Sequence, residues 1–425
     1  MDADAIVVGG GLAGLVSASR LAEAGADVTL VERRSTVGGR VRTREVDGFT
    51  LDCGFQVLFT SYPAVERELA TDDLDLRAFA PGATICRPGS RAVLSDPLRE
   101  PSAAVESALN HEVTFSDKLR TLALRYDLTR RADDAFFAGP DESIREYLDD
   151  WGFSEEYVAN FVEPFYGGIT LDRSLSTSKQ VFEYTFRSMS RGSIAVPAEG
   201  MAAIAGQLEG RARDAGVTIR TGETAETVTP HSGGARVERA DGSDLDAKTV
   251  VVAASPPEAR RLTRVESVPE AGIGTVTAWY ALPEGSSFGT GKRILLNAAG
   301  ESPNAVVPMS EVAPEYASGD RPLIGATFLG EDALDRDDDD LREDTLEALS
   351  SWFPERGFEG IETIDVDRIR FAQFAQPPGI HETLPDPDDP AGPVVLAGEY
   401  TEWSAIQGAL ESGRRAAETA GAHLR

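Results

Sequence analysis

The first part of the chain alternates between two hydrophobic periods. A β-branched run, AIVVGG, leads into a third glycine, then into LAGLVSASRLAEAG with helical spacing, and then into a second β-branched run, DVTLVE. Short apolar runs bounded by glycine predict strands, and apolar positions three and four residues apart predict a helix. Residues 1–80 therefore predict strand, tight turn, helix and strand, with Gly25 ending the helix.

The rest of the chain continues in blocks of different pattern. Residues 90–195 are mostly helical by their apolar spacing. Residues 266–390 combine strand-like runs such as GTVTAWYAL with one helix, DDLREDTLEALSSWF. An α/β pattern returns at residues 196–265 and again at residues 393–425. The pattern thus predicts α/β blocks at the start, middle and end of the chain, with two other blocks inserted between them.

Composition indicates a high-salt environment and excludes nucleic acid as a partner. The chain has 425 residues, of which 41% are hydrophobic, enough for a large core and two domains. Its formal net charge is −30, the acid is dispersed, and only four lysines occur. Such a chain is typical of a halophilic protein, because high salt screens self-repulsion; an acidic surface that binds a partner is the alternative. The same charge repels phosphates, so no nucleic-acid partner is expected.

Spacing excludes several kinds of site. Cys53 and Cys86 form neither a disulfide framework nor a metal site, the histidines are scattered, and no Ser-His-Asp arrangement is visible. We therefore predict no metal and identify no catalytic side chain. The first apolar run lacks a basic leader, and no stretch reaches about 20 apolar residues. We expect a soluble, cytoplasmic protein.

The glycine turn after the first strand fits a dinucleotide-binding fingerprint. Gly9 permits a tight turn, Gly11 lets the backbone approach a pyrophosphate, and Gly14 lets helix and strand pack closely. The helix then points its free N–H groups at the phosphates. Glu32 ends the second strand, where it can accept hydrogen bonds from a ribose, and its charge disfavours NADP. A turn made for packing alone is the alternative. The predicted nucleotide-binding residues here are Gly9, Gly11, Leu12, Ala13, Gly14 and Glu32.

The next residues distinguish between nucleotides. The stretch ERRSTVGGRVRT adds the pair Gly38-Gly39 followed by Arg40. With the preceding fingerprint it resembles the flavin amine oxidase superfamily, which includes carotenoid desaturases and protoporphyrinogen oxidases. The resemblance implies that FAD is bound, with Glu32 on the adenosine ribose and Arg34 and Arg40 near ribose and pyrophosphate. An arginine can donate to two phosphate oxygens at once. A glycine turn with solvated arginines is the alternative.

Three further stretches resemble the same superfamily. LDCGFQVL is similar to a segment that passes the flavin ring, and the strand after VPAEGMAAIAGQLEGRARDAG is similar to one whose backbone contacts adenine. VVLAGEYTEWSAIQGALESGRRAA is similar to the C-terminal flavin motif, in which an acid binds the ribityl chain and a helix start faces the flavin; the usual acid there is Asp. The resemblance implies these additional cofactor residues: Gly54, Phe55, Gln56, Ala225, Gly398, Glu399 and Ile406.

The resemblance also implies a fold and a reaction class. The fold is α/β, with a discontinuous, Rossmann-like FAD-binding domain of the GR2 type and an inserted α+β substrate domain. The expected FAD-binding domain comprises residues 1–85, 196–265 and 391–425, and the expected substrate domain comprises residues 86–195 and 266–390. Flavin N5 would accept a hydride from a substrate C–H bond, and oxygen or a quinone would later take the electrons.

The substrate stays open at this point. Desaturation of a hydrophobic carotenoid or isoprenoid predicts a long apolar tunnel and membrane association. Oxidation of an amine to an imine predicts a short pocket with a pair of aromatic rings facing the flavin, and a non-catalytic FAD-binding protein predicts a blocked ring face. Tyr400 and Trp403 beside the C-terminal motif are the expected aromatic wall. Lys292, the only lysine in the last third, has no motif that assigns it to the flavin.

One basic cluster stands out in this acidic chain. It lies in residues 118–131, in a stretch with helical spacing. It predicts either a helix that contacts a membrane peripherally or a solvated face with partners four residues away. The oligomeric state is not predicted.

Overall fold

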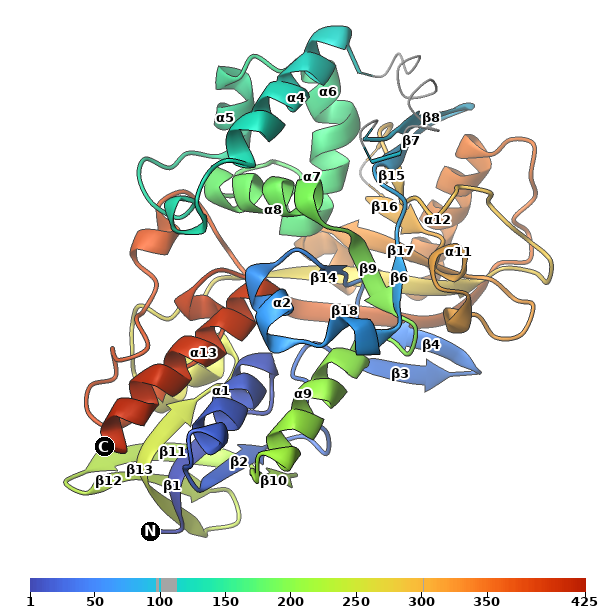
Figure 1. The fold of residues 1–425 in the computed structure, drawn as a ribbon. Helices are drawn as coiled ribbons and strands as arrows, with labels where there is room; N and C mark the ends of the chain where they lie inside the picture. The colour runs from blue at the N-terminus through green and yellow to red at the C-terminus, as the bar shows by residue number, and fades with distance from the viewer. Residues whose placement is uncertain (97–98, 101–112, 301) are drawn as a thin grey trace.

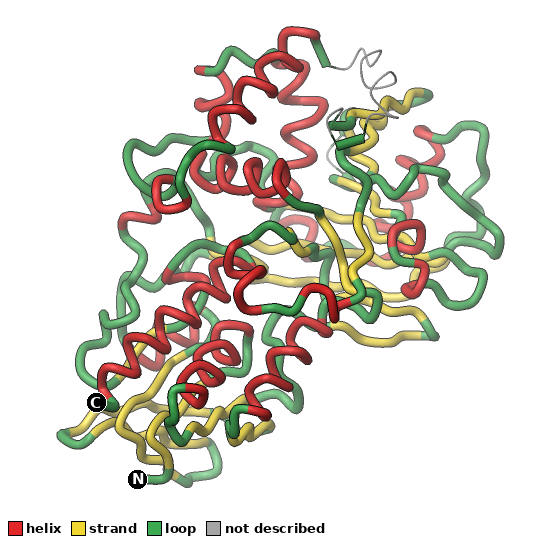
Figure 2. Tube along the Cα trace, in the orientation of Figure 1, coloured by secondary structure: helices red, strands yellow, loops and turns green. Residues whose placement is uncertain are grey.

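The computed structural model describes residues 1–96, 99–100, 113–300 and 302–425. Two large sheets and a helical lobe make up the molecule, and both termini lie at the end formed by the first sheet (Figure 1). The tube view in Figure 2 shows helices against the first sheet, helices in the lobe, and further helices beside the second sheet.

The first sheet carries the strand–glycine–helix unit predicted from the sequence. Its order is β10-β2-β1-β13-β12-β11, with β19 pairing β13. Strands β10, β2, β1, β13 and β19 run parallel, whereas β11, β12 and β13 are antiparallel neighbours. Parallel strands are covered on both faces, which explains the continuous apolar runs of β1 and β2. The strands are β1 (Ala3–Val8), β2 (Val28–Glu32), β10 (Thr218–Thr221), β11 (Ala225–His231), β12 (Gly234–Arg239), β13 (Asp244–Val252) and β19 (Val394–Leu396).

Three helices lie side by side against this sheet: α1 (Leu12–Glu23), α9 (Ala202–Asp214) and α13 (Ile406–His423) (Figure 1). The predicted α/β class is confirmed, and the strands of this sheet come from the start, middle and end of the chain. The division of the chain into two domains stays a prediction.

A buried carboxylate ties the helices together. Glu68, at the end of α2 (Pro63–Glu68), has a fully buried side chain. It accepts a hydrogen bond of 2.6 Å from Arg20 on α1 and one of 2.9 Å from Arg211 on α9. Burial raises the pKa of Glu68, but the hydrogen bonds from Arg20, Arg211 and Arg67 outweigh it and leave the pKa below its usual value.

The second sheet is mainly antiparallel. Its order is β18-β14-β17-β16-β15-β7-β8, in which only the β15–β7 pair is parallel among the described strands. Helix α12 (Asp338–Trp352) packs on one face through Leu341, Leu349 and Trp352. Asp338, Asp339 and Asp340 form the first turn of this helix, where negative charge is favourable. The strands are β7 (Ala83–Arg87), β8 (Ser90–Leu94), β14 (Gly272–Ala281), β15 (Leu295–Asn297), β16 (Ala305–Val307), β17 (Leu323–Leu329) and β18 (Glu362–Phe374).

The helical lobe comprises α4 (Phe115–Leu128), α5 (Ile144–Asp150), α6 (Glu155–Tyr157), a π-helix (Val158–Val162), α7 (Glu163–Thr170) and α8 (Lys179–Arg191). Smaller elements are β3 (Thr43–Val46), β4 (Phe49–Asp52), β5 (Leu58–Phe59), β6 (Leu76–Ala78), β9 (Ile194–Pro197), α10 (Pro256–Thr263) and α11 (Met309–Val312). None of the described helices combines the length and the apolar composition that a bilayer-crossing helix requires.

Candidate active site

The three glycines of the first turn have different structural roles. Gly9 has φ +112°, and a Cβ at Gly14 would lie 1.9 Å from the carbonyl oxygen of Gly9, so packing and backbone geometry require both. Gly11 caps α1 with φ −73° and ψ 178°, which any residue can adopt. A Cβ there would approach only the Cα of Gly39, at 3.9 Å. The protein's own packing leaves the space in front of Gly11 free.

A second glycine turn lies against the first. The N–H of Gly38 donates to the carbonyl of Gly10 at 2.8 Å, and a Cβ at Gly39 would lie 3.1 Å from the Cα of Gly11. Arg34 donates from Nη1 to the carbonyl of Gly39 at 2.6 Å. Residues 9–14 and 34–39 therefore form one surface of backbone at the N-terminus of α1. No side chain caps this helix start, so its first amides are free to bind an anion.

Glu32 lies buried beside both turns. Its Oε2 accepts from the N–H of Gly10 at 2.7 Å, and its Oε1 accepts from the N–H of Arg34 at 2.9 Å. Each oxygen keeps a lone pair for a further donor such as a ribose hydroxyl. The chain leaving β10 crosses here, because the N–H of Glu223 donates to the carbonyl of Glu32 at 3.0 Å. This crossing leads directly to Ala225 at the start of β11.

Two guanidinium groups beside the turns lack anionic partners. In the described part of the chain neither Arg34 nor Arg42 forms an ion pair, although most arginines do, and the buried Nε of Arg42 has no hydrogen-bond partner. The pKa of Arg34 is lowered, first by burial and then by the charges of Arg42 and Arg33. A diphosphate would relieve this repulsion and bind the orphaned donors, so these residues fit a dinucleotide.

The predicted residues further along the chain meet one another. Arg40 forms an ion pair with Glu399 across 359 positions and donates to the carbonyl of Ala372 at 2.9 Å. Gln56 donates from Nε2 to the carbonyls of Arg40 and Cys53, both at 3.0 Å. The structure thus joins Gln56, Arg40 and Glu399 in one chain of contacts. Gly398 lies next to it, and its N–H donates to Ser412 of α13 at 2.8 Å.

The segment that follows β4 contacts the second sheet. The N–H of Gly54 donates to Asp367 on β18 at 3.0 Å, and the N–H of Phe55 donates to Thr277 on β14 at 3.1 Å. Trp279 also donates to Asp367, at 3.1 Å. Sequence reasoning missed Asp367 and Thr277. Because both lie on strands, the period-2 alternation of TVTAW and DVDRI could have placed them on one face.

Helix α13 begins at Ile406, within the predicted start. Ala405 precedes it, no side chain caps it, and its first turn has no acidic residue. Gln407 accepts a hydrogen bond from the N–H of Ala64 at 2.8 Å, which ties this end to α2. The free amides and the positive end of the helix dipole favour negative charge at this position.

Tyr400 and Trp403 do not form the expected aromatic wall. The hydroxyl of Tyr400 lies 2.9 Å from the carbonyl oxygen of Ala397, and its fully buried ring packs with the core of the first sheet. Trp403 instead packs in the main core, 5.2 Å from Tyr184 and 5.7 Å from Phe137. The prediction was wrong because the turn between the two residues sends their side chains into different clusters.

Two titratable side chains, His381 and Tyr184, contact Phe137 and are kept neutral by burial. The ring of His381 is tilted against that of Phe137, with the ring centres 4.7 Å apart, and neither of its nitrogens has a hydrogen-bond partner among the described residues. Burial lowers the pKa of His381 to about 4, despite the nearby charge of Asp141. Burial likewise raises the pKa of Tyr184 to about 12. Lys292 is exposed on the loop before β15, and the other lysines lie on α4, α8 and β13.

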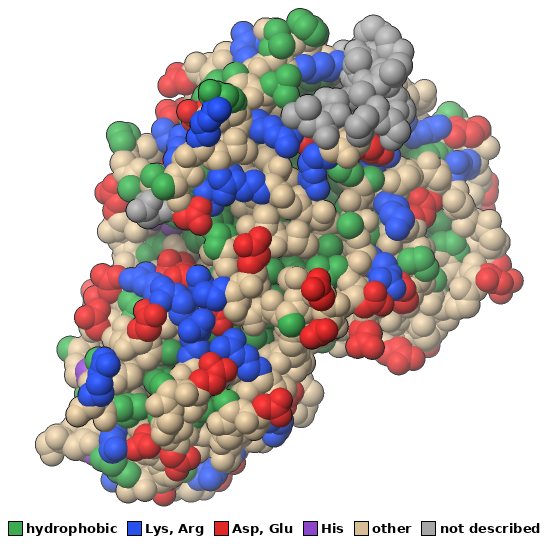
Figure 3. Space-filling model, viewed as in Figure 1, with side chains coloured by type: hydrophobic (Ala, Val, Ile, Leu, Met, Phe, Trp, Pro, Cys, Tyr) green, Lys and Arg blue, Asp and Glu red, His purple; other side chains and the backbone are tan. Residues whose placement is uncertain are grey.

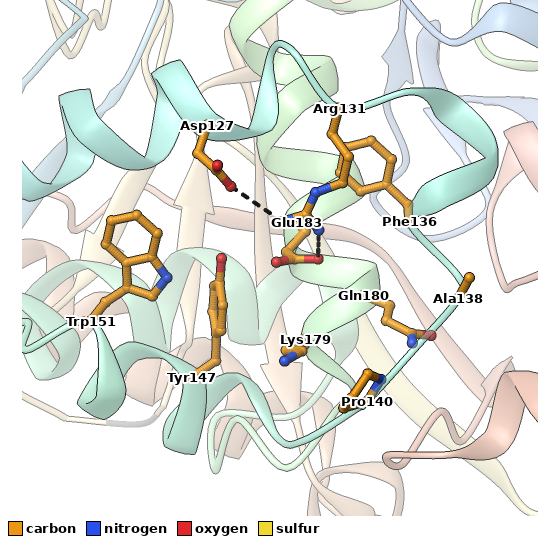
Figure 4. A pocket seen from close by; sticks show the side chains of 10 residues that line it. All are labelled: Asp127, Arg131, Phe136, Ala138, Pro140, Tyr147, Trp151, Lys179, Gln180 and Glu183. Atoms are coloured by element: carbon orange, nitrogen blue, oxygen red, sulfur yellow. Dashed lines mark hydrogen bonds and ion pairs between the residues drawn. The ribbon is translucent and has the colours of Figure 1, made fainter.

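A separate pocket of about 240 Å³ lies in the helical lobe, away from the glycine turns (Figure 1, Figure 4). Figure 4 shows Arg131 directed at Asp127 and Glu183, with the rings of Tyr147 and Trp151 to one side. Arg131 pairs with Asp127 and Glu183 inside this pocket and Lys179 pairs with the neighbouring Glu142, so its charges are already compensated and it is not the dinucleotide site.

Comparison with known proteins gives a family. The sequence model of the family described as flavin containing amine oxidoreductase matches residues 12–420. A carotenoid 3,4-desaturase of Haloarcula japonica is 55% identical over 51 residues, which are 12% of this chain and 10% of the relative. A 4,4'-diaponeurosporene oxygenase of Staphylococcus aureus is 44% identical over 57 residues, 13% of this chain and 12% of the relative. These matches span a small fraction of each curated relative.

Solved structures of low identity share the fold over the whole chain. An oxidoreductase from Methanosarcina mazei is 18% identical with a TM-score of 0.76, covering 97% of this chain and 99% of its own. A variant of putrescine oxidase is 19% identical with a TM-score of 0.75, covering 99% of both chains. Cyclohexylamine oxidase from Brevibacterium oxydans is 17% identical with a TM-score of 0.71, covering 100% of this chain and 99% of its own.

Proposed function

Because the chain belongs to the family of flavin-containing amine oxidoreductases, and is a flavin-dependent oxidoreductase, we propose that it binds FAD and dehydrogenates a hydrophobic isoprenoid-like substrate. The proposed cofactor residues are those predicted from the sequence, with Arg42 added. Oxygen or a quinone is the proposed electron acceptor.

The observation that carries FAD is the pair of guanidiniums at the glycine turns, Arg34 and Arg42, which form no ion pair among the described residues. Arg34 and Arg42 repel each other unless an anion lies between them and the free amides of α1. The open space before Gly11 allows the close backbone approach that a diphosphate needs, and Glu32 offers acceptors to a ribose. A monophosphate flavin would leave Glu32 and the segment at Ala225 without a nucleoside to bind.

The contacts beyond the turns support a place for the rest of the cofactor. Arg40 and Glu399 hold each other, and Gln56 fixes the backbone of Arg40. Bound flavin would supply hydride acceptance at N5. The residues of the chain would orient it: Phe55 is held by Thr277, and the start of α13 stabilises negative charge.

The side chains near Phe55 favour an apolar substrate. The ring of Phe55 lies 6.2 Å from that of Phe79, and both are half-buried. Phe161, Phe165 and Ile294 are also half-buried, and they pack against both the main core and the small cluster between β7, β15 and β16. Half-buried aromatic and aliphatic groups at such a seam can bind a hydrocarbon chain without an unpaired charge. The names of the relatives that match over a short stretch, a carotenoid 3,4-desaturase and a 4,4'-diaponeurosporene oxygenase, also favour a hydrophobic isoprenoid-like substrate.

Flavin bleaching without oxygen tests both parts. The protein is purified in high salt, and the flavin released by denaturation is identified by chromatography. Phytoene in lipid vesicles should bleach the visible flavin absorbance, whereas a saturated hydrocarbon of similar length should not, because it has no activated C–H bond. Release of FMN would overturn the cofactor. Bleaching by diamines or aromatic amines, and not by phytoene, would replace the proposed substrate with an amine.

A further inference from the structure

Helix α4 exposes a stripe of large hydrophobic side chains. Phe115, Leu119, Leu122 and Tyr126 are 75%, 52%, 43% and 64% exposed. Their spacing of four, three and four residues places them along one face of the helix. Apart from Met1, the described part of the chain exposes no other large hydrophobic side chain to this degree. Contiguous apolar groups of this kind mark an interaction surface.

The opposite face fixes α4 to the lobe, so the stripe cannot turn inward. Leu124 and Leu128 are buried. The buried carboxylate of Asp117 accepts from the N–H and the hydroxyl of Ser154, at 2.9 and 2.6 Å. Arg125 forms an ion pair with Asp96. The stripe therefore faces solvent as a rigid surface.

Basic residues are concentrated in the segment that carries the stripe, in an otherwise acidic protein. Residues 113–131 contain five basic and two acidic residues, whereas the whole chain carries a formal charge of −30. Ion pairs compensate part of the positive charge of this segment: Arg120 pairs with the buried Asp117, Arg125 with Asp96, and Arg131 with Asp127 and Glu183. The guanidinium of Arg130 lies 3.3 Å from the ring centre of Tyr126. Figure 3 shows hydrophobic and basic side chains together at the top of the molecule, over α4.

We propose that α4 docks this protein onto an anionic lipid surface. A helix lying in the interface inserts its apolar face among the acyl chains and keeps its basic groups at the lipid phosphates. Phe115, Leu119 and Leu122 supply the apolar face. Tyr126 with Arg130 supplies an aromatic ring and a long cation of the kind that prefer the headgroup region. A second copy of the chain fits less well, because it would bring two basic faces together. The inference is argued from this surface, and its test does not require turnover, although a hydrophobic isoprenoid substrate also predicts membrane association.

Vesicle flotation of the flavin-loaded protein tests the docking. We expect binding to phosphatidylglycerol vesicles and at least about tenfold weaker binding of a double variant, Phe115→Ser with Leu122→Ser, because two apolar side chains lose their burial. Arg130→Gln should weaken binding about fivefold, and Arg213→Gln on α9 should not. Raising salt from about 0.15 M to about 1 M should weaken the electrostatic part, because the Debye length falls from about 8 to 3 Å.

A site-specific probe separates insertion from simple adsorption. Both native cysteines are buried, so a fluorophore on Leu122→Cys can be attached selectively. Its emission should shift to the blue with phosphatidylglycerol vesicles, and a label on Ser232→Cys, exposed in the turn between β11 and β12, should not respond. Equal binding of the wild type and the double variant would overturn the proposal. So would equal binding to phosphatidylcholine and phosphatidylglycerol vesicles, or a wild-type dimer without lipid that the double variant abolishes.

Discussion

Alanine at Gly11 and alanine at Gly14 should separate cofactor binding from folding. The two glycines lie three residues apart in the same turn, and both belong to the fingerprint. Gly11→Ala should leave the apoprotein stable and prevent FAD binding, because the added methyl enters the space that the diphosphate would occupy. Gly14→Ala should destabilise the apoprotein itself.

The structure sets the size of each effect. Gly11 has an extended backbone that alanine adopts, and its new Cβ would have no neighbour closer than 3.9 Å. The weaker N-cap and the lower entropy of the unfolded chain roughly cancel, so the apoprotein should change by about 1 kcal/mol or less. At Gly14 the new Cβ would lie 1.9 Å from the carbonyl oxygen of Gly9 and 3.1 Å from the Cβ of Ala253. Strand and helix must then separate, at a cost of about 3 kcal/mol or more.

Denaturant titrations with and without FAD measure both quantities. FAD at about 100 times its Kd should stabilise the wild type by about 2.7 kcal/mol, and this increment should vanish in Gly11→Ala. If Gly11→Ala keeps the full increment, the diphosphate does not bind at this turn. If apo Gly14→Ala is as stable as the wild type, the close approach of strand and helix is not what requires this glycine.

Three further perturbations test individual charges. Arg34→Gln or Arg42→Gln should weaken FAD binding at least about tenfold in flavin-fluorescence titrations, while exposed Arg33→Gln should not. Glu68→Gln should cost about 3 kcal/mol of unfolding free energy at pH 7. Because the folded pKa of Glu68 lies below its unfolded value of about 4.3, its contribution should fade as pH falls through the folded pKa, and the variant should lose less stability there. His381 has a folded pKa of about 4 and an unfolded pKa of about 6.5, so only the unfolded state gains a proton between these values. Lowering the pH from about 6.5 to about 4 should therefore lower the unfolding midpoint of the wild type and should not lower that of His381→Gln. A parallel decline in that variant would refute the assignment.

The turn that opens the chain could be predicted because its determinants are local. Strand, glycines, helix, strand and Glu32 lie within 32 residues, and each has a backbone reason that the residue type alone reveals. The alternation of α/β, helical and mixed blocks elsewhere followed from hydrophobic period in the same way. The similarity to flavin-binding segments extended this to residues near both ends of the chain.

Only the structure shows which arginines near the glycine turns are free of ion pairs and could bind a diphosphate. Five arginines occur between residues 33 and 44, and their types are identical. Arg33 is exposed, Arg40 pairs with Glu399, and Arg44 pairs with Asp365 and Asp367. The path of the second glycine turn places the remaining two, Arg34 and Arg42, beside the first turn. Neither forms an ion pair within the described part of the chain.

The sequence by itself determined the opening strand–glycine–helix–strand unit and the alternation of blocks around it, because backbone preference and hydrophobic period act over a few residues. Tertiary structure alone decided which partners meet: Gly54 with Asp367, or Arg40 with Glu399. It also decided that Tyr400 and Trp403 enter different cores and that one apolar stripe of α4 stays uncovered. Burial and pairing depend on contacts with residues far away in the sequence, and no local pattern contains that information.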